Sequence, residues 1–248
     1  MTKEAFLSKL NTALPWVSES AGSDLYDFMR QVLEKNKVLN LTAITDEDDF
    51  LKKHFVDSLS LLDIDICLLN SRSDKTKIID VGTGAGFPGI PLAIALRGKC
   101  FKFTLCDSLQ KRLKFLEEVV ESLKLTNVEL VHARAEDLAC DGKYREAYDL
   151  ALSRAVAELP VLCEICLPFV KCGGDFISYK MADCDGEIAS AENAIRTLGG
   201  DFENLRVSSY NIGSDPEDKE RVLIEIKKTS STPSKYPRKP GDIKKKPL

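Results

Sequence analysis

The chain has 248 residues, of which 44% are hydrophobic and 30% are charged, and its formal net charge is −4. These proportions exclude a collagen-like, intrinsically disordered or membrane-spanning chain. The small negative charge also argues against a protein that coats nucleic acid by bulk attraction. However, from Lys227 to the end eight basic residues stand against one acid, a net charge of +7, so the remainder carries −11. We therefore expect an acidic body with a basic tail.

The first 70 residues have helical patterning. Apolar residues recur at helical spacing before Pro15, which ends the first predicted helix. Ser23 is the expected N-cap of a second helix, and a third is expected to begin near Asp46. The short polar segment 40–42 separates these two helices. Residues 1–72 are therefore predicted to form a helical N-terminal region.

Beyond this region, strand patterns alternate with helical ones, which is typical of a parallel sheet covered by helices on both faces. The predicted strands are Lys77–Val81, Phe101–Cys106, Val128–His132, Asp149–Leu152, Asp175–Tyr179, Phe202–Asn211 and Arg221–Lys228. Because only a turn-rich segment separates the last two, we expect them to form an antiparallel hairpin. The pattern predicts an α/β domain of about seven strands over residues 73–228. The tail, 229–248, is rich in Pro, Lys and Ser and is predicted to be irregular or mobile.

The eight cysteines show no disulfide framework. Cys163 and Cys166 form a C-x-x-C pair, but they lie in an apolar run that predicts a buried helix. The only histidines, His54 and His132, are distant in sequence, so we expect core thiols and no metal site. The N-terminus lacks a signal-peptide pattern, and no apolar run approaches the ~20 residues of a membrane span. We therefore expect a cytoplasmic protein with reduced thiols and no membrane partner.

A glycine-rich segment follows the first predicted strand and opens a helix. Gly82, Gly84 and Gly86 match the G-x-G-x-G pattern of methyltransferases that use S-adenosylmethionine. Gly84, Gly86 and Gly89 match the G-x-G-x-x-G dinucleotide fingerprint instead, with Asp107 as its ribose acid. A glycine turn that binds nothing is the third alternative.

The position of the strand favours the methyl donor. In the dinucleotide pattern the first glycine directly follows the strand, which makes it Gly82, and position 87 should then be glycine but is Phe87. Asp80 also ends the strand with a carboxylate. That charge would repel a pyrophosphate, whereas it would attract the ammonium group of S-adenosylmethionine.

Carboxylates also follow the next two strands. Asp107 ends the second strand, where it can accept both ribose hydroxyls of an adenosine, cap the helix from Ser108, or do both. Ala135 and Glu136 follow the third strand, where an adenine edge would lie. Glu136 is alternatively a surface acid in the first turn of a helix.

Several strings together resemble a known family, the ribosomal small-subunit RNA methyltransferase G family, also called glucose-inhibited division protein B. They extend over almost the whole chain. The segments are 40–42, 54–58, 80–92, 106–116, 152–155 and 236–241.

This resemblance implies a Rossmann-like class I methyltransferase that uses S-adenosylmethionine. Its implied acceptor is N7 of guanine 527 in bacterial 16S ribosomal RNA, within the small subunit or a precursor. The donor-binding positions carried over from the family are Gly82, Phe87, Ala135, Glu136 and Arg154. A methyltransferase of another acceptor and a non-catalytic nucleotide-binding protein are the alternatives.

The chemistry of guanine N7 sets few demands on the protein. N7 is an unprotonated lone pair, so it can accept a methyl group without a general base, and no catalytic residue is required. Arg154 ends the fourth strand and is a candidate to bind the donor carboxylate or a guanine oxygen. The alternative is a salt bridge from Arg154 to an acid such as Glu158.

Five basic residues are candidates for RNA contact, and for the first three of them a solvated side chain is the alternative. They are Lys111, Arg112, Lys180, Arg238 and Lys239. His54 and Asp57 lie three apart on one predicted helix. We favour a buried hydrogen-bonded pair that holds the N-terminal helices on the core over a catalytic pair.

Overall fold

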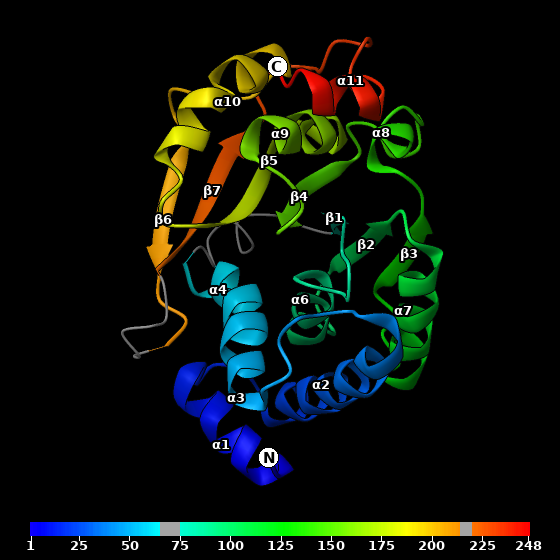
Figure 1. Ribbon diagram of the computed structural model, residues 1–248, viewed down its shortest axis with the longest axis vertical. Helices are drawn as coiled ribbons and strands as arrows, with labels where there is room; N and C mark the ends of the chain where they lie inside the picture. Colours follow the sequence, from blue (N-terminus) through cyan, green and yellow to red (C-terminus); the bar gives the residue numbers. More distant parts are fainter. Residues whose placement is uncertain (65–74, 214–219) are drawn as a thin grey trace.

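The structure is a computed structural model that describes residues 1–64, 75–213 and 220–248. Figure 1 shows a central twisted sheet with helices on both faces and the two termini at opposite ends of the molecule. The strand order is β3-β2-β1-β4-β5-β7-β6. Strands β1 to β5 are parallel, whereas β7 runs antiparallel to both β5 and β6. The predicted boundary at residues 72–73, Cys67 and the turn at 214–216 lie outside the described residues.

All seven predicted strands are present, and the terminal antiparallel hairpin is confirmed. Their bounds are β1 Thr76–Val81, β2 Phe101–Asp107, β3 Val128–His132, β4 Tyr148–Arg154, β5 Val170–Met181, β6 Arg206–Tyr210 and β7 Arg221–Lys227. Residues on alternate sides of each strand enter two separate hydrophobic cores. Ile78 and Phe103 face the core shared with the N-terminal helices, whereas Ile79 and Val81 face the other core.

The helices of the N-terminal region are α1 Lys3–Ala13, α2 Glu19–Leu39, α3 Glu47–Phe50 and α4 Asp57–Ile64, with a π-helical stretch at Leu51–Val56. The others are α6 Gly89–Ala95, α7 Gln110–Ser122, α8 Ala135–Leu138, α9 Leu159–Cys166, α10 Asp185–Thr197 and α11 Pro240–Lys245. Helices α2, α6 and α7 lie on one side of the sheet, and α8 to α11 lie on the other (Figure 1). No helix in the described part of the chain is both long and apolar enough to cross a membrane.

The start of α2 differs from the prediction. Its N-cap is Ser18, whose hydroxyl accepts a hydrogen bond from the amide of Ala21. The predicted cap, Ser23, lies inside the helix because α2 extends back to pack on α1. A Cβ at Gly22 would come within 2.8 Å of Leu7, so the two helices are in close contact there. The predicted start of the third helix near Asp46 is confirmed, and Asp46 is the N-cap of α3, since its side chain accepts hydrogen bonds from the amides of Asp48 and Asp49.

The polar break after α2 is shaped by one side chain. Asn36 accepts hydrogen bonds from the amides of Leu41 and Thr42, and its own amide donates to the Thr42 carbonyl. This arrangement turns the chain after α2 and directs Leu41 and Thr42 toward the edge of the sheet where the strands end.

The C-x-x-C pair lies on α9, and both thiols are fully buried in the second core. Burial raises the pKa of Cys163 and of Cys166 well above the ordinary thiol range. Their prediction as core thiols is therefore confirmed. No cluster of residues suited to hold a metal occurs in 1–64, 75–213 or 220–248.

The C-terminal tail is irregular over residues 229–239, as predicted, but it also contains α11, which was not predicted, and it packs against the rest of the fold. Arg238 forms a two-pronged ion pair with Glu164 of α9, at 2.8 and 2.6 Å, and its backbone amide donates to the same carboxylate. Glu164 is fully buried, and burying its charge demands such a partner. Ile243 of α11 is also buried beside α9. The tail therefore completes the second core.

Candidate active site

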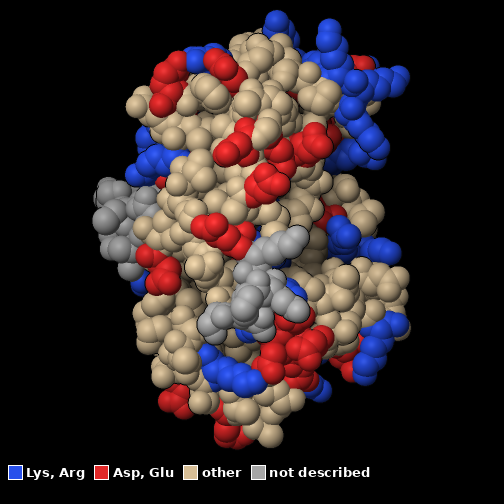
Figure 2. All heavy atoms as spheres, turned by 60° about the vertical axis from the view of Figure 1, so that its left-hand side comes forward, with Lys and Arg blue, Asp and Glu red and all other residues tan. Residues whose placement is uncertain are grey.

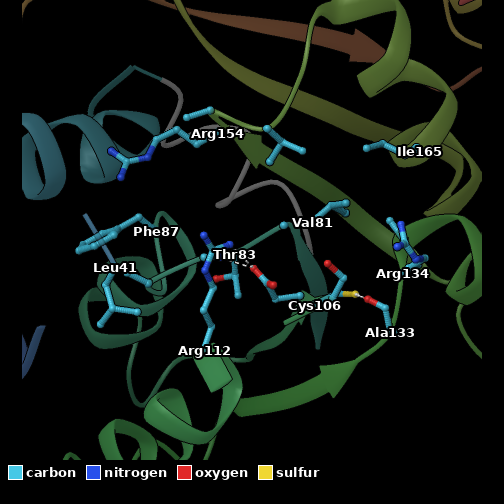
Figure 3. Close-up of a pocket in the computed structure, with 18 of the residues that line it drawn as sticks. Leu41, Val81, Thr83, Phe87, Cys106, Arg112, Ala133, Arg134, Arg154 and Ile165 are labelled. Carbon is cyan, nitrogen blue, oxygen red and sulfur yellow. Dashed lines mark hydrogen bonds and ion pairs between the residues drawn. The ribbon is translucent and has the colours of Figure 1, made fainter. Parts of the chain in front are cut away.

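A cavity of about 480 Å³ opens at the carboxyl ends of β1 to β4. The strand order reverses between β1 and β4, and ligands of open α/β sheets bind at such switch points. Figure 3 shows Arg154 and Phe87 on one side of the cavity and Arg134 and Ile165 on the other, with Thr83 between them. The volume is within the range of small-molecule sites.

Asp80 holds the two ends of the glycine loop together through hydrogen bonds. One carboxylate oxygen accepts hydrogen bonds from the Thr83 hydroxyl at 2.7 Å and from the Gly89 amide at 3.0 Å. Asp80 is fully buried and does not line the cavity, so the predicted contact with a donor ammonium group is not supported by its position. Burial raises the pKa of Asp80 to about 6. The structure gives this residue the role of closing the loop.

Gly84 brings the backbone to the cavity. Its φ is +61°, which disfavours residues with a side chain, and a Cβ placed there would have only the Gly82 carbonyl oxygen within 4 Å, at 3.9 Å. A side chain at Gly84 would therefore extend into open space at the cavity. Gly86, by contrast, does not line the cavity, and a Cβ placed there would come within 2.7 Å of Ile90 and 3.0 Å of Leu116.

Asp107 joins the loop to the second strand. It is buried, accepts hydrogen bonds from the amides of Gly84 at 3.0 Å and Leu109 at 2.8 Å, and pairs with Arg112. Helix α7 begins at Gln110 with Leu109 as its N-cap, so the predicted alternative, in which Asp107 caps a helix from Ser108, was wrong. The bond to Leu109 instead fixes the turn that precedes α7. The carboxylate also lines the cavity and has acceptor capacity beyond these three bonds.

Arg154 is held by the N-terminal region. Its guanidinium donates to Asp57 at 2.6 Å, to the Lys53 carbonyl at 3.0 Å and to His54 Nδ1 at 2.9 Å. The Tyr210 hydroxyl donates to the other oxygen of Asp57. The acid beside Arg154 is thus Asp57 and not the predicted Glu158. His54 and Asp57 are linked through Arg154, which ties the N-terminal helices to the end of β4.

The protonation of His54 follows from its partners. Arginine can only donate, so Nδ1 accepts, and Nε2–H donates to the Thr42 hydroxyl at 2.9 Å. The ring stacks on Phe87 with centroids 4.2 Å apart, and Arg154 lies 5.1 Å over the same phenyl ring. Burial and the nearby guanidinium lower the pKa of His54 to about 3. His54 is therefore neutral at physiological pH.

This lowered pKa makes stability depend on pH. Between about pH 6.5 and pH 3, His54 is protonated in the unfolded chain but neutral in the folded protein. The free energy of unfolding therefore falls as the pH falls through this range. Between pH 7 and pH 5, we expect wild type to lose about 2 kcal/mol relative to His54→Gln. Denaturant titration of both proteins at each pH measures this difference. Parallel pH profiles would contradict the assignment.

The structure brings seven of the nine predicted donor-binding residues to this cavity: Gly82, Gly84, Phe87, Asp107, Ala135, Glu136 and Arg154. Asp80 and Gly86 lie behind it. Sequence reasoning missed Leu41, Arg134 and Ile165, which also line it. Arg134 directly precedes the predicted pair at the end of β3, so its position carried a usable signal. Ile165 comes from the middle of α9, and nothing local to it indicated a cavity.

The five candidates for RNA contact have different surroundings. Lys111 and Lys239 are exposed, whereas Arg112 lines the cavity beside Asp107. Lys180 donates to Glu187 at 2.5 Å and to the Ala157 carbonyl at 2.8 Å. Arg238 is engaged by Glu164, so it is a structural residue of the tail.

Sequence comparison identifies the family. Residues 22–214 match the family described as rRNA small subunit methyltransferase G. A relative of that name from Alkaliphilus oremlandii is 46% identical over 94% of this chain and 92% of its own. Another from Leuconostoc citreum is 43% identical over the full length of both chains. The chain belongs to the rRNA small subunit methyltransferase G family. As a member of this family, it is a methyltransferase whose cofactor is S-adenosylmethionine.

Solved structures agree on the fold. A putative O-methyltransferase from Klebsiella pneumoniae matches with a TM-score of 0.54 at 15% identity, over 81% of this chain and 90% of that one. An S-adenosylmethionine-dependent O-methyltransferase from Thermotoga maritima matches with a TM-score of 0.52 at 15% identity, over 82% and 73%. The Rossmann-like class I fold implied by the resemblance is thereby confirmed for this member of the methyltransferase G family.

Proposed function

We propose that the protein transfers the methyl group of S-adenosylmethionine to N7 of guanine 527 in 16S ribosomal RNA, within the small subunit or a precursor of it. Membership of the methyltransferase G family supports ribosomal RNA as the substrate. The observation that carries the proposal is the cavity at the β1–β4 switch point, where the Gly84 backbone, the Asp107 carboxylate and Arg154 come together.

The residues of this cavity fit the donor. The uncovered backbone at Gly84 leaves space for a ligand, and Asp107 and Glu136 offer acceptors for ribose hydroxyls and an adenine amino group. Arg154 has N–H donors beyond its bonds to Asp57, Lys53 and His54, and these can bind the amino acid carboxylate. Phe87 contributes an apolar surface beside them. When bound, S-adenosylmethionine supplies an electrophilic methyl group on a positively charged sulfur.

The cavity is consistent with alignment as the main source of catalysis. N7 already carries the attacking lone pair, so no proton has to leave before the methyl group is accepted. His54 is neutral, but its two ring nitrogens are engaged by Arg154 and Thr42, so it is not poised as a base. The residues bind, orient and desolvate the reactants.

Local basic groups would attract the RNA. Figure 2 shows Lys and Arg side chains gathered at the upper end of the molecule, the end that α11 occupies in Figure 1. Lys239 and the three lysines at 244–246 are exposed there, and Lys111 and Lys114 are exposed on α7. Acidic side chains are distributed over the rest of the same face. We therefore propose that phosphates meet these two basic elements and not the body as a whole.

The proposal is tested in a strain from which the gene is deleted. Reduction and aniline cleavage break the RNA strand at N7-methylguanosine, and primer extension then locates the break. We expect a stop at the target guanine of 16S ribosomal RNA in the parent and its loss in the deletion strain. An unchanged stop in the deletion strain would refute the assignment.

A further inference from the structure

A second cavity adjoins the donor cavity. It has a volume of about 260 Å³ and lies at the carboxyl ends of β4 and β5. Arg154 and Ala155 line both cavities. Because these two residues are shared, a group bound in the second cavity lies beside a group bound in the first.

The charged side chains of the second cavity fall into two sets. Arg154 pairs with Asp57, and Lys180 pairs with Glu187, so these four neutralise one another. Asp183 and Arg221 have no ion-pair or hydrogen-bond partner among the described residues, and Arg221 Nε is buried without an acceptor there. Within the part of the chain that the structure describes, Asp183 is therefore an unengaged carboxylate of this cavity and Arg221 an unengaged guanidinium.

The carboxylate of Asp183 complements one edge of guanine. Guanine presents the acceptors O6 and N7 on one edge, and the donors N1–H and N2–H₂ on its Watson–Crick edge. A carboxylate can accept from N1–H and N2–H₂ together. Adenine has a lone pair at N1 and no 2-amino group, so it would leave the carboxylate unpaired, which costs binding free energy.

We propose that the second cavity holds the target guanine, turned out of the RNA, with Asp183 accepting hydrogen bonds from its Watson–Crick edge. The proposal rests on the proposed function, since it needs guanine N7 as the acceptor. The edge that carries N7 and O6 then faces Arg154 and the donor cavity. Enzymes that modify a base take it out of the stack into such a pocket.

The backbone at Ala155, which lines both cavities, has a conformation that is typical of functional sites. Ala155 follows β4 with a φ of +56°, a conformation that residues with a Cβ rarely adopt. Such strain is concentrated at functional sites. Lys180 holds the next turn in place, because its ammonium group donates to the Ala157 carbonyl and to Glu187, which in turn accepts from the Leu159 amide. The wall between the two cavities is therefore supported from α10.

The test compares Asp183→Asn with Asp185→Asn. Asp185 is also exposed and lies two residues away, but it does not line the cavity. Methylation is measured on small subunits reconstituted with guanine or inosine at the target position. Inosine keeps N1–H, O6 and N7 and lacks only the 2-amino group. We expect wild type and Asp185→Asn to prefer guanine by roughly tenfold to 100-fold in kcat/KM.

For Asp183→Asn, kcat/KM on guanine should fall by roughly tenfold to 100-fold. The preference of this variant for guanine over inosine should largely disappear. Its affinity for S-adenosylmethionine should stay within about twofold of wild type, which also reports that the variant is folded. An unchanged preference for guanine in Asp183→Asn would overturn the assignment of Asp183. Failure of wild type to methylate guanine would overturn the proposed function, and with it this proposal, so the two failures are distinguishable.

Discussion

Gly84→Val is expected to weaken binding of S-adenosylmethionine by at least about 100-fold. Position 84 has a φ of +61° and lines the donor cavity, with no protein atom close to the site of a Cβ. A valine there would fill space that the ligand needs, and its branched side chain would also strain the backbone by about 1–2 kcal/mol. Isothermal titration calorimetry measures the affinity directly.

Gly98→Val is the matched control for this loss. Gly98 also has a positive φ, +78°, and a Cβ there would meet no atom within 4 Å, but the residue is not part of the cavity. It therefore carries a similar backbone cost without entering the ligand site. Gly98→Val should bind the donor as wild type does. Equal donor affinity for the two variants would refute the assignment of the glycine loop.

Arg238→Gln is expected to destabilise the fold by about 3–5 kcal/mol, because it leaves the fully buried carboxylate of Glu164 without its cation. For a chain of this size that corresponds to a fall in Tm of at least about 6 °C. Thermal unfolding followed by circular dichroism measures it. Deletion of the whole tail should have a larger effect, since Lys228 is also buried and loses its bond to the Thr232 hydroxyl.

Lys239→Gln is the control that removes one positive charge from the tail without breaking the ion pair between Arg238 and Glu164. Lys239 is adjacent, carries the same charge and is exposed. Its replacement should leave Tm within about 1 °C of wild type, since surface substitutions of this kind change stability little. A Tm of Arg238→Gln equal to that of Lys239→Gln would mean that the ion pair with Glu164 does not hold the tail.

Local patterns in the sequence were sufficient for the sheet and the glycine loop. Strands such as Val128–His132 show their apolar character within five residues. The glycines of the loop, Gly82, Gly84 and Gly86, are likewise close together in sequence. The Arg154–Asp57 pair could not be found in this way, because its members are 97 residues apart and meet only when the N-terminal helices pack on the sheet. Asp80 matched the motif, but whether it faces the ligand or supports the loop depends on packing.

The tail illustrates how composition misleads. Its lysines, serines and prolines are typical of disordered segments, yet it folds over α9. The indication that the tail packs on the fold lies in the α9 segment instead. Glu164 stands in an apolar run that predicts burial, and a buried carboxylate requires a cation from elsewhere in the chain. The sequence therefore indicated that a partner exists, but only the folded structure identifies Arg238.

Complementation of the deletion strain tests the central claim most directly, that the cavity at β1–β4 supports methylation of guanine N7. The signal is the primer-extension stop at the target guanine after reduction and aniline cleavage. Wild-type protein should restore the stop, and Gly98→Val should restore it as well, whereas Gly84→Val produced at the same level should not. A stop restored equally by Gly84→Val, or restored by none of the three proteins, would contradict the account.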